Sequence, residues 1–221
     1  MKIMTLTDFH GTYAVIPKLA RIAQQESVDA IVIAGDITNF GPISTASQIV
    51  RGLLVVGVPT LWIPGNCDPK EMISHSSMPQ LSIHFSSTEI NDTVFLGFGG
   101  STPTPFPGMY EFTEEEYMKK AKDTFEKIDT SKKIVVVSHV PPYNTSTDVL
   151  YSGIKVGSKT MRTIVEEYEP VAFLCGHIHE SRNSDYIGNT LVVNPGPAMN
   201  GYFGIVEGKE ERWRSNLSSI E

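Results

Sequence analysis

The chain has 221 residues and a formal net charge of −7, and 40% of its residues are hydrophobic while 19% are charged. This composition is typical of a globular protein and excludes a disordered chain, and the length fits a single domain, residues 1–221, with a sizeable core. The acidic balance argues against a protein that binds nucleic-acid phosphates through a basic face.

Seven short apolar runs, rich in valine and isoleucine and bounded by glycine, proline, asparagine or aspartate, are predicted to be β-strands. They cover residues 2–6, 30–34, 60–63, 94–98, 133–138, 171–175 and 191–193. Residues 31–34 and 134–137 are apolar throughout, which is typical of strands buried on both faces. Two shorter strand-like pieces, 204–207 and 211–214, follow near the end of the chain.

Amphipathic stretches with a helical spacing of apolar residues separate the first strands and recur later in the chain. The predicted helices lie around residues 16–23, 49–54, 113–128 and 158–168. A capping box of Thr113 and Glu116 opens the third helix, and Pro170 stops the fourth. This alternation of strands and helices predicts one α/β domain.

The chain contains two cysteines, Cys67 and Cys175, which are too few for a disulfide framework and suit a reducing compartment. The opening residues reach a charged side chain too soon for a secretory leader, and no apolar run approaches the length of a membrane span. We therefore expect a cytoplasmic protein without a membrane partner, and the periodic faces assign no oligomeric state. Cys175 ends an apolar strand and is expected in the core.

Five of the predicted strands end in side chains that bind metal ions, most of them beside glycine. These side chains are Asp8, His10, Asp36, Asn66, His139, His177 and His179. Because the carboxyl ends of strands form the ligand-binding edge of open α/β sheets, we expect them to converge. Taken singly, each also fits a turn, a helix cap or a buried histidine. Alternate residues of an extended segment face the same way, so His177 and His179 would lie on one side. Two imidazoles on one side are costly unless they bind something, which favours a bound group at this pair.

Together the seven side chains suit two metal ions, because they are too many for one tetrahedral ion. A carboxylate can bridge two metals about 3.5–4 Å apart, the arrangement used for in-line displacement at phosphorus. The donors are nitrogen and oxygen without an obligatory thiolate, which favours Mn, Fe, Zn or Ni over Cu(I) or an iron–sulfur cluster. The adjacent Gly35, Gly65 and Gly176 let the backbone turn sharply and approach the ions closely.

The chain resembles the calcineurin-like metallophosphoesterases, whose motifs are D-x-H, G-D, G-N-H-[DE], a distal histidine and G-H-x-H. All five blocks occur here in order from Asp8 to His179, so the resemblance spans most of the chain. The lack of a large cap and the segment Asn194-Pro195-Gly196 look most like the small Icc-related branch of phosphoesterases. The resemblance implies a four-layer αββα sandwich, in which two mixed sheets are flanked by helices and the site lies at the strand ends.

The resemblance also implies a dinuclear centre, with manganese as the expected metal. Asp8, His10 and His179 would bind the first ion, Asp36 would bridge both, and Asn66, His139 and His177 would bind the second. A hydroxide between the metals would attack phosphorus, and the ions would neutralise charge on the phosphoryl oxygens. The expected catalytic residues are Asn66, Cys67, Asp68 and His139.

One position departs from the family pattern, because Cys67 stands where a histidine usually follows the asparagine. In the family that histidine is thought to stabilise the transition state or protonate the leaving group. A thiol has a reference pKa of about 8.5 and donates hydrogen bonds weakly, so it replaces imidazolium poorly. We therefore expect diesters or activated esters to be preferred over alkyl monoesters; the alternative is that Cys67 only lines the site. Asp68 is expected to orient a neighbouring ligand.

Two residues near the motifs are candidate substrate contacts. Arg182 suits a phosphate in bidentate fashion, although a solvated loop arginine is the commoner case. Asn39 follows the second motif closely enough to line the site. The remaining histidines, His75 and His84, lie outside every motif and are expected at the surface or partly buried.

The segment 99–108 carries three prolines and is long for a loop in a compact domain, which indicates a functional loop. Phe106, Met109 and Tyr110 would form an apolar wall against a base or an aryl group. The alternative is that these three side chains only fill the small core of the loop itself.

These observations predict a dinuclear-metal phosphoesterase that acts on small phosphodiesters or nucleotides. A nuclease of the same superfamily is the second interpretation, and the charge of −7 without a cluster of lysine and arginine counts against it. A non-catalytic scaffold that keeps the fold is the third. Such scaffolds typically lose metal ligands, whereas all seven positions are filled here.

Overall fold

The computed structural model describes residues 1–209 and 212–220, and these form eleven strands and four α-helices. The strands are β1 (Lys2–Leu6), β2 (Ala30–Ala34), β3 (Thr60–Ile63), β4 (Ser87–Ile90), β5 (Thr93–Phe98), β6 (Lys133–Ser138), β7 (Ala172–Leu174), β8 (Asn183–Ile187), β9 (Thr190–Asn194), β10 (Tyr202–Lys209) and β11 (Arg212–Ser219). The helices are α1 (Ile16–Gln25), α2 (Ile43–Leu54), α3 (Glu114–Phe125) and α4 (Lys159–Tyr168), with 3₁₀ turns at Lys70–Ser74, His179–Ser181 and Ala198–Asn200. No helix within the described residues has the length and apolar character needed to cross a bilayer.

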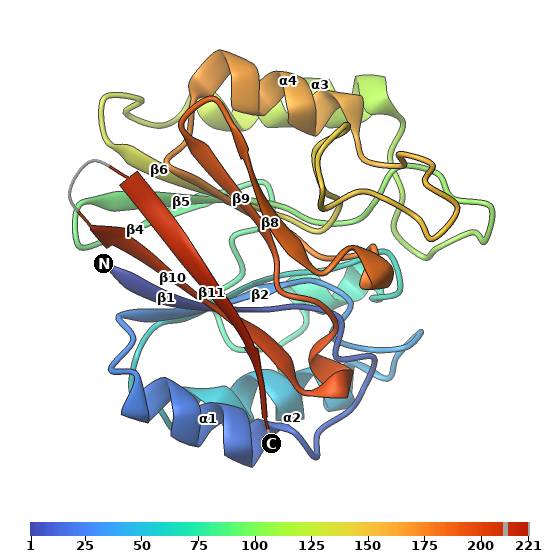
Figure 1. Cartoon of the computed structure of the whole chain (residues 1–221). Coiled ribbons are helices and arrows are strands. Elements are labelled where there is room, and N and C mark those ends of the chain that lie inside the picture. The colour runs from blue at the N-terminus through green and yellow to red at the C-terminus, as the bar shows by residue number, and fades with distance from the viewer. Residues whose placement is uncertain (210–211, 221) are drawn as a thin grey trace.

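The strands form two mixed sheets. The first has the order β11-β10-β1-β2-β3, in which β1, β2 and β3 are parallel, β10 is antiparallel to β1, and β11 is antiparallel to β10. The second has the order β4-β5-β6-β7-β9-β8, with a parallel centre and antiparallel edge strands. The sheets stack between two helical layers, α1 and α2 on one side and α3 and α4 on the other (Figure 1). The predicted four-layer αββα sandwich is confirmed.

Three apolar clusters hold the four layers together. One lies between the first sheet and α1 and α2, one between the second sheet and α3 and α4, and one between the two sheets. Strand β2 contributes to two of them, since Ile31 and Ile33 point to the helices while Val32 and Ala34 point to the other sheet. Because successive side chains of a strand alternate, a strand buried on both faces must be apolar at every position.

The helices α3 and α4, which cover the second sheet, begin at the predicted caps. Thr113 and Glu116 form the expected capping box of α3, and the Ser158 hydroxyl accepts a hydrogen bond from the Met161 N–H at the start of α4. The carboxylate of Glu114, the first residue of α3, accepts a hydrogen bond from the same Ser158 hydroxyl at 2.8 Å. The two helices that cover the second sheet are therefore tied together at their N-terminal ends.

The structure contains two strands that the sequence did not predict, β4 and β8. Both are edge strands with mostly exposed polar side chains, so neither presents an apolar run. The C-terminal hairpin is longer than predicted, because β10 and β11 pair from Tyr202 with Ser219 to Lys209 with Arg212. The predicted second strand of this hairpin begins at Glu211, which lies outside the described residues.

Candidate metal centre

The loops that follow β1, β2, β3, β6 and β7 meet at one edge of the sandwich, on the right in Figure 1. Backbone hydrogen bonds connect them: the Asp8 N–H donates to the Gly35 carbonyl at 3.0 Å, and the Gly176 N–H donates to the His139 carbonyl at 3.0 Å. The His177 N–H links the two sheets by donating to an Asp8 carboxylate oxygen at 3.1 Å. The predicted ligands are thereby brought to one place.

Four of the seven predicted ligands have a left-handed backbone. The φ angle is 54° at Asp8, 43° at His10, 48° at Asp36 and 68° at His177. Residues other than glycine rarely adopt this conformation, which costs about 1–2 kcal/mol for each residue. Such strain gathers at functional sites, where the surrounding structure holds it. The strained backbone at these four residues therefore indicates a functional site independently of the motif spacing.

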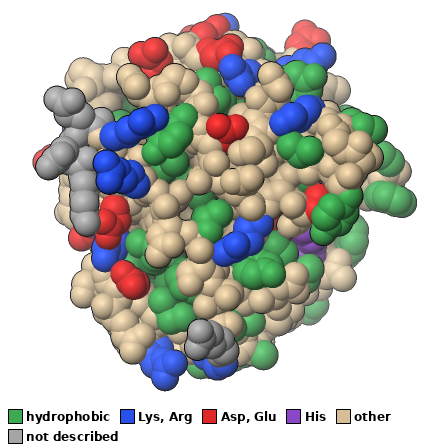
Figure 2. Space-filling view, viewed as in Figure 1, with side chains coloured by type: hydrophobic (Ala, Val, Ile, Leu, Met, Phe, Trp, Pro, Cys, Tyr) green, Lys and Arg blue, Asp and Glu red, His purple; other side chains and the backbone are tan. Residues whose placement is uncertain are grey.

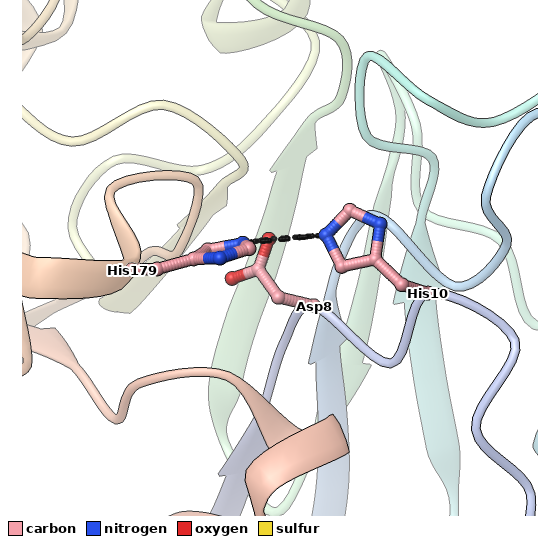
Figure 3. Close-up of side chains that lie close together, drawn as sticks. All are labelled: Asp8, His10 and His179. Carbon is pink, nitrogen blue, oxygen red and sulfur yellow. Dashed lines mark hydrogen bonds and ion pairs between the residues drawn. The ribbon is translucent and has the colours of Figure 1, made fainter.

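The two carboxylate oxygens of the buried Asp8 have different surroundings. Oδ2 accepts hydrogen bonds from the Thr7 hydroxyl at 2.9 Å and the His177 N–H at 3.1 Å. Oδ1 accepts none and faces the Nε2 atoms of His179 at 3.4 Å and His10 at 3.9 Å. The two rings flank the carboxylate, and their Nε2 atoms are 3.2 Å apart (Figure 3). One oxygen is held by the protein, and the other is left for a cation.

Asp36 shows the same division between its two oxygens. Oδ1 accepts a hydrogen bond from the Cys67 N–H at 2.8 Å. Oδ2 lies 3.6 Å from His10 Nε2 and 3.4 Å from His139 Nε2. Since His10 belongs to the group around Asp8, the free oxygen of Asp36 lies between the two halves of the cluster. This is the position that a bridging carboxylate requires.

The second half of the cluster is built around His139, which is fully buried. Its Nδ1 lies 2.7 Å from the Ala34 carbonyl, and its Nε2 lies 3.1 Å from Asn66 Oδ1. The ring of His177 packs edge-on against His139, with centroids 5.0 Å apart. The Ala34 carbonyl accepts the proton on Nδ1, so Nε2 is the atom that His139 would offer to a metal after losing its own proton.

The charges of the cluster depend on one another. Burial opposes the ionisation of Asp36, yet the imidazoles of His139 and His10 hold the pKa of Asp36 well below its ordinary value. Burial likewise disfavours a charge on His139, yet the Asp36 carboxylate raises the pKa of His139 to about 9. Burial and the neighbouring His139 lower the pKa of His177 to about 4. His177 is therefore neutral at physiological pH, which is the form of imidazole that binds metals.

We predicted that His177 and His179 face the same way because they lie on an extended segment. This prediction is wrong, because the segment 176–179 is not extended. His177 is left-handed, and a 3₁₀ turn begins at His179. Asn194 holds the segment, because its side-chain amide nitrogen donates to the Ile178 carbonyl at 2.9 Å. Asn194 thus positions both histidines, and its place before a proline and a glycine was its only sequence signal.

Asp68 is fully buried and joins the loops that follow β2 and β3. Its Oδ1 accepts a hydrogen bond from the Thr38 N–H at 2.7 Å, and its Oδ2 accepts from the N–H groups of Ile37 at 3.0 Å and Gly65 at 2.8 Å. Burial and the neighbouring Asp36 carboxylate raise the pKa of Asp68 to about 6. These contacts hold the backbone on either side of Asp36, and the orienting or catalytic role of Asp68 stays a prediction.

Cys67 lines the cavity in front of the cluster, with its Sγ 3.6 Å from Asn66 Nδ2. Burial and the Asp36 carboxylate raise the pKa of the Cys67 thiol. The side chain is therefore a neutral thiol and a weak hydrogen-bond donor. The other cysteine, Cys175, is fully buried in the cluster between the second sheet and its helices, as predicted.

The described residues that line the cavity in front of the cluster include neither of the two candidate substrate contacts. The Arg182 guanidinium donates to the carbonyls of Pro195 and Ser218, each at 3.1 Å, and lies over the ring of Tyr202. These contacts give Arg182 a structural role that neither of its sequence interpretations included. Asn39 is exposed. Contact of either side chain with substrate stays a prediction.

His84 is a positioning residue that the motifs did not reveal. It is partly buried; its Nδ1 accepts a hydrogen bond from the Gly99 N–H at 2.9 Å, and its Nε2 lies 2.7 Å from the Tyr110 hydroxyl. The N–H groups of Met109 and Tyr110 then donate to the Asn66 carbonyl at 2.7 and 3.3 Å. The loop that begins at Gly99 is thus anchored on His84 and holds the backbone of a predicted ligand.

The buried environment of His84 leads to a prediction about pH. Burial lowers the pKa of His84 to about 3, whereas an imidazole in an unfolded chain titrates near about 6.5. Between these values the unfolded chain binds a proton that the native state does not. The free energy of unfolding should therefore fall as the pH is lowered through this range, by about 1.4 kcal/mol per pH unit from this residue. We expect His84→Gln to remove that contribution in urea unfolding of metal-free protein between about pH 4.5 and 6.5.

The exposed His75 provides the matched control. His75→Gln should keep the pH slope of the wild type, because the substitution leaves the buried imidazole in place. A wild-type slope in His84→Gln would contradict the assignment of this titration to His84.

The cluster fits divalent metal ions. Three sets of possible ligand atoms lie within 4.8 Å of one another, namely Asp8 with His10 and His179, His10 with Asp36 and Cys67, and Asp8 with Asp36 and His139. A buried carboxylate oxygen without a hydrogen bond, such as Asp8 Oδ1, is costly unless a cation binds it. Carboxylate, amide and imidazole donors suit Mn, Fe, Zn or Ni. The two halves, joined through Asp36, therefore fit two ions.

Comparisons with known proteins show the family and the fold of this chain. A family model described as calcineurin-like phosphoesterase matches residues 1–181. An uncharacterised protein of Methanocaldococcus jannaschii is 41% identical over 203 residues, which cover 89% of this chain and 88% of that protein. A protein of Vesicomyosocius okutanii, named as a probable cyclic nucleotide phosphodiesterase, is 22% identical over 192 residues, covering 86% of this chain and 78% of that protein. The structure of a dimetal phosphatase from Danio rerio has the same fold, with a TM-score of 0.69 at 11% identity over 99% of this chain and 96% of that one.

Proposed function

The chain belongs to the calcineurin-like phosphoesterase family and is a metal-dependent phosphoesterase, and on this premise we propose that it hydrolyses small phosphodiesters at a centre of two divalent metal ions. The observation that supports this proposal most is the division of the Asp36 carboxylate. One oxygen is held by the Cys67 N–H, and the other lies free between His10 and His139. A carboxylate so placed can be shared by two ions, and two-ion sites suit in-line displacement at phosphorus. The relative named as a probable cyclic nucleotide phosphodiesterase supports a small diester as substrate.

The predicted ligand sets are the ones we propose, with manganese as the expected metal. They are Asp8, His10 and His179 for one ion, Asn66, His139 and His177 for the other, and Asp36 for both. Ions bound there would supply an activated water and neutralise charge on the phosphoryl oxygens. The chain contributes orientation, because donors from Thr7, His177 and Cys67 fix one oxygen of each carboxylate. The free oxygens are therefore aimed before any ion or substrate binds.

Metal analysis combined with turnover tests this function. Protein loaded with Mn is expected to hold two ions per chain and to hydrolyse bis-p-nitrophenyl phosphate, with activity lost in EDTA and restored by Mn. A protein that binds no metal and stays inactive with added Mn would point to a scaffold instead. Faster cleavage of long single-stranded DNA than of small diesters would favour a nuclease.

Cys67 leads to a prediction about monoesters and diesters. The thiol stands where the family pattern has a histidine, and it is a weak donor to a leaving-group oxygen. An imidazolium at this position would protonate poor leaving groups, so we expect Cys67→His to raise the rate on alkyl monoesters relative to activated aryl diesters by about tenfold or more. The measurement is kcat/KM on ethyl phosphate, whose alkoxide needs a proton to leave, and on bis-p-nitrophenyl phosphate, whose phenolate does not, both with Mn.

Cys67→Ala is the control, since it removes the thiol without adding a proton donor. Its ratio of monoester to diester rates should match the wild type. An unchanged ratio in Cys67→His would show that the residue does not set this preference.

A further inference from the structure

The metal cluster opens into a cavity of about 670 Å³, which is larger than one phosphate requires and suits a small organic ligand. Away from the cluster the lining is largely apolar. We call the apolar side of this cavity the apolar wall, and its residues are Phe40, Pro103, Pro105, Phe106, Leu150 and Val156. Of the three side chains predicted to form such a wall, Phe106 lines the cavity, whereas Met109 and Tyr110 are not among its lining residues. Figure 2 shows hydrophobic side chains gathered beside a histidine surface at the right edge of the molecule, where the strand ends lie in Figure 1.

Two phenylalanines of the apolar wall are largely open to solvent. Phe40 is 56% exposed, and Phe106 is 86% exposed. Exposed aromatic side chains that gather at a cavity mark binding sites, because they gain from being covered by a ligand. Phe40 is held at the cavity by its N–H, which donates to the Cys67 carbonyl at 3.0 Å. Aromatic rings and proline rings both present flat faces, which suit a flat ring of a ligand.

Another part of the apolar wall, Leu150 and Val156, lies on the segment between β6 and α4. Asp148 is fully buried there and accepts hydrogen bonds from the N–H groups of Thr145 at 2.9 Å and Gly157 at 3.0 Å. The Val156 N–H donates to the Asp148 carbonyl at 3.0 Å. These contacts hold the segment that presents Leu150 and Val156 to the cavity. The wall is therefore formed before a ligand arrives, which lowers the cost of binding.

The charges of the cavity restrict the ligand further. Among the described residues that line it there is no lysine or arginine, and the acidic side chain outside the metal cluster is Glu180. A second anionic group away from the metals would therefore meet no cation and would be repelled by Glu180. A phosphodiester carries one negative charge, so its ester groups can be neutral and apolar.

We propose that the apolar wall binds an aromatic ester group of a phosphodiester substrate that carries a single negative charge. This inference rests on the proposed function and adds the class of substrate to it. The aromatic group is either a carbocyclic aryl group or a nucleobase, since both present a flat ring to Phe40 and Phe106.

Binding of hydrolysis-resistant monoanions to the Mn-loaded protein tests the proposal by calorimetry. Methyl(phenyl)phosphinate should bind about tenfold more tightly than dimethylphosphinate, because covering a phenyl ring removes its apolar surface from water. The second arm is the thymidine analogue in which a methylphosphinate is joined to the 5′ carbon through carbon in place of the 5′ oxygen, so that it too has no ester bond to cleave. A tenfold gain for the thymidine compound includes a nucleobase among the groups that the wall binds, and a gain confined to the phenyl compound assigns the wall to a carbocyclic aryl group.

The double variant Phe40→Ala/Phe106→Ala should lose the tenfold gain, and both substitutions are at exposed positions that the fold does not need. Val55→Ala is the matched control, because Val55 is a 68% exposed apolar residue at the far end of α2. Equal dissociation constants for all three ligands would overturn the proposal, as would a double variant that keeps the gain. Equal constants together with EDTA-sensitive turnover of bis-p-nitrophenyl phosphate would leave the proposed function standing. A tenfold gain without any turnover would instead support the wall and reject the function.

Discussion

Asp36→Asn is expected to lower kcat on a small aryl diester by at least about 10³-fold and to leave fewer than two bound ions per chain. The amide can keep its oxygen on the Cys67 N–H, which occupies Oδ1 of the carboxylate. The amide nitrogen then takes the place of Oδ2, between His10 and His139. An N–H₂ group there offers protons where an anion is needed, so it repels metal ions. Metal analysis and turnover of bis-p-nitrophenyl phosphate measure the two effects.

Asp123→Asn is the control for the loss of one acidic charge. Asp123 is a half-exposed residue of α3 that pairs with Lys119. This variant should keep both ions and the wild-type rate. Two bound ions and a wild-type rate in Asp36→Asn would remove Asp36 from the metal centre.

Gly65→Ala is expected to lower the free energy of unfolding by about 3 kcal/mol and to reduce kcat by about 10²-fold. A Cβ at position 65 would overlap the backbone nitrogen and Oδ1 of Asp36 and would lie 2.7 Å from its Cγ. The backbone atom cannot be moved by a change of rotamer, so the loop itself must shift. The Asp68 carboxylate binds the Gly65 N–H and resists this shift. Urea unfolding and metal-dependent turnover measure the two losses.

Gly57→Ala separates this steric effect from the conformational cost of replacing glycine. A Cβ at Gly57 would meet nothing within 4 Å, but its φ of +84° disfavours alanine. We expect a cost of about 1 kcal/mol and no change in metal content or rate. If Gly65→Ala lowered the free energy of unfolding and the rate no more than Gly57→Ala does, the two loops would not be closely packed at Asp36.

The strands that form the centre of each sheet could be predicted from the sequence because both of their faces are buried. Runs such as 31–34 and 134–137 are apolar at every position, a pattern that strands with one solvent-exposed face do not show. Strands β4 and β8 could not be predicted in this way. They lie at sheet edges, and their side chains are largely polar and exposed. Pairing with the neighbouring strand stabilises them, and their own sequence contains no apolar pattern that would predict a strand.

The ligands of the candidate centre could be proposed from the sequence because each follows a strand, and strand ends meet. The residues that hold those ligands carried no such signal. His84 anchors a loop on Asn66 through the Tyr110 hydroxyl, and Asn194 holds the segment of the two histidines through the Ile178 carbonyl. Both act through contacts between segments far apart in the chain, which the spacing of a motif does not record.

The central claim is that two metal ions share Asp36, and anomalous diffraction from crystals grown with Mn tests it most directly. We predict two anomalous peaks per chain, one beside Asp8, His10 and His179 and one beside Asn66, His139 and His177, with Asp36 in contact with both. A single peak, or peaks at other residues, would contradict the dinuclear centre.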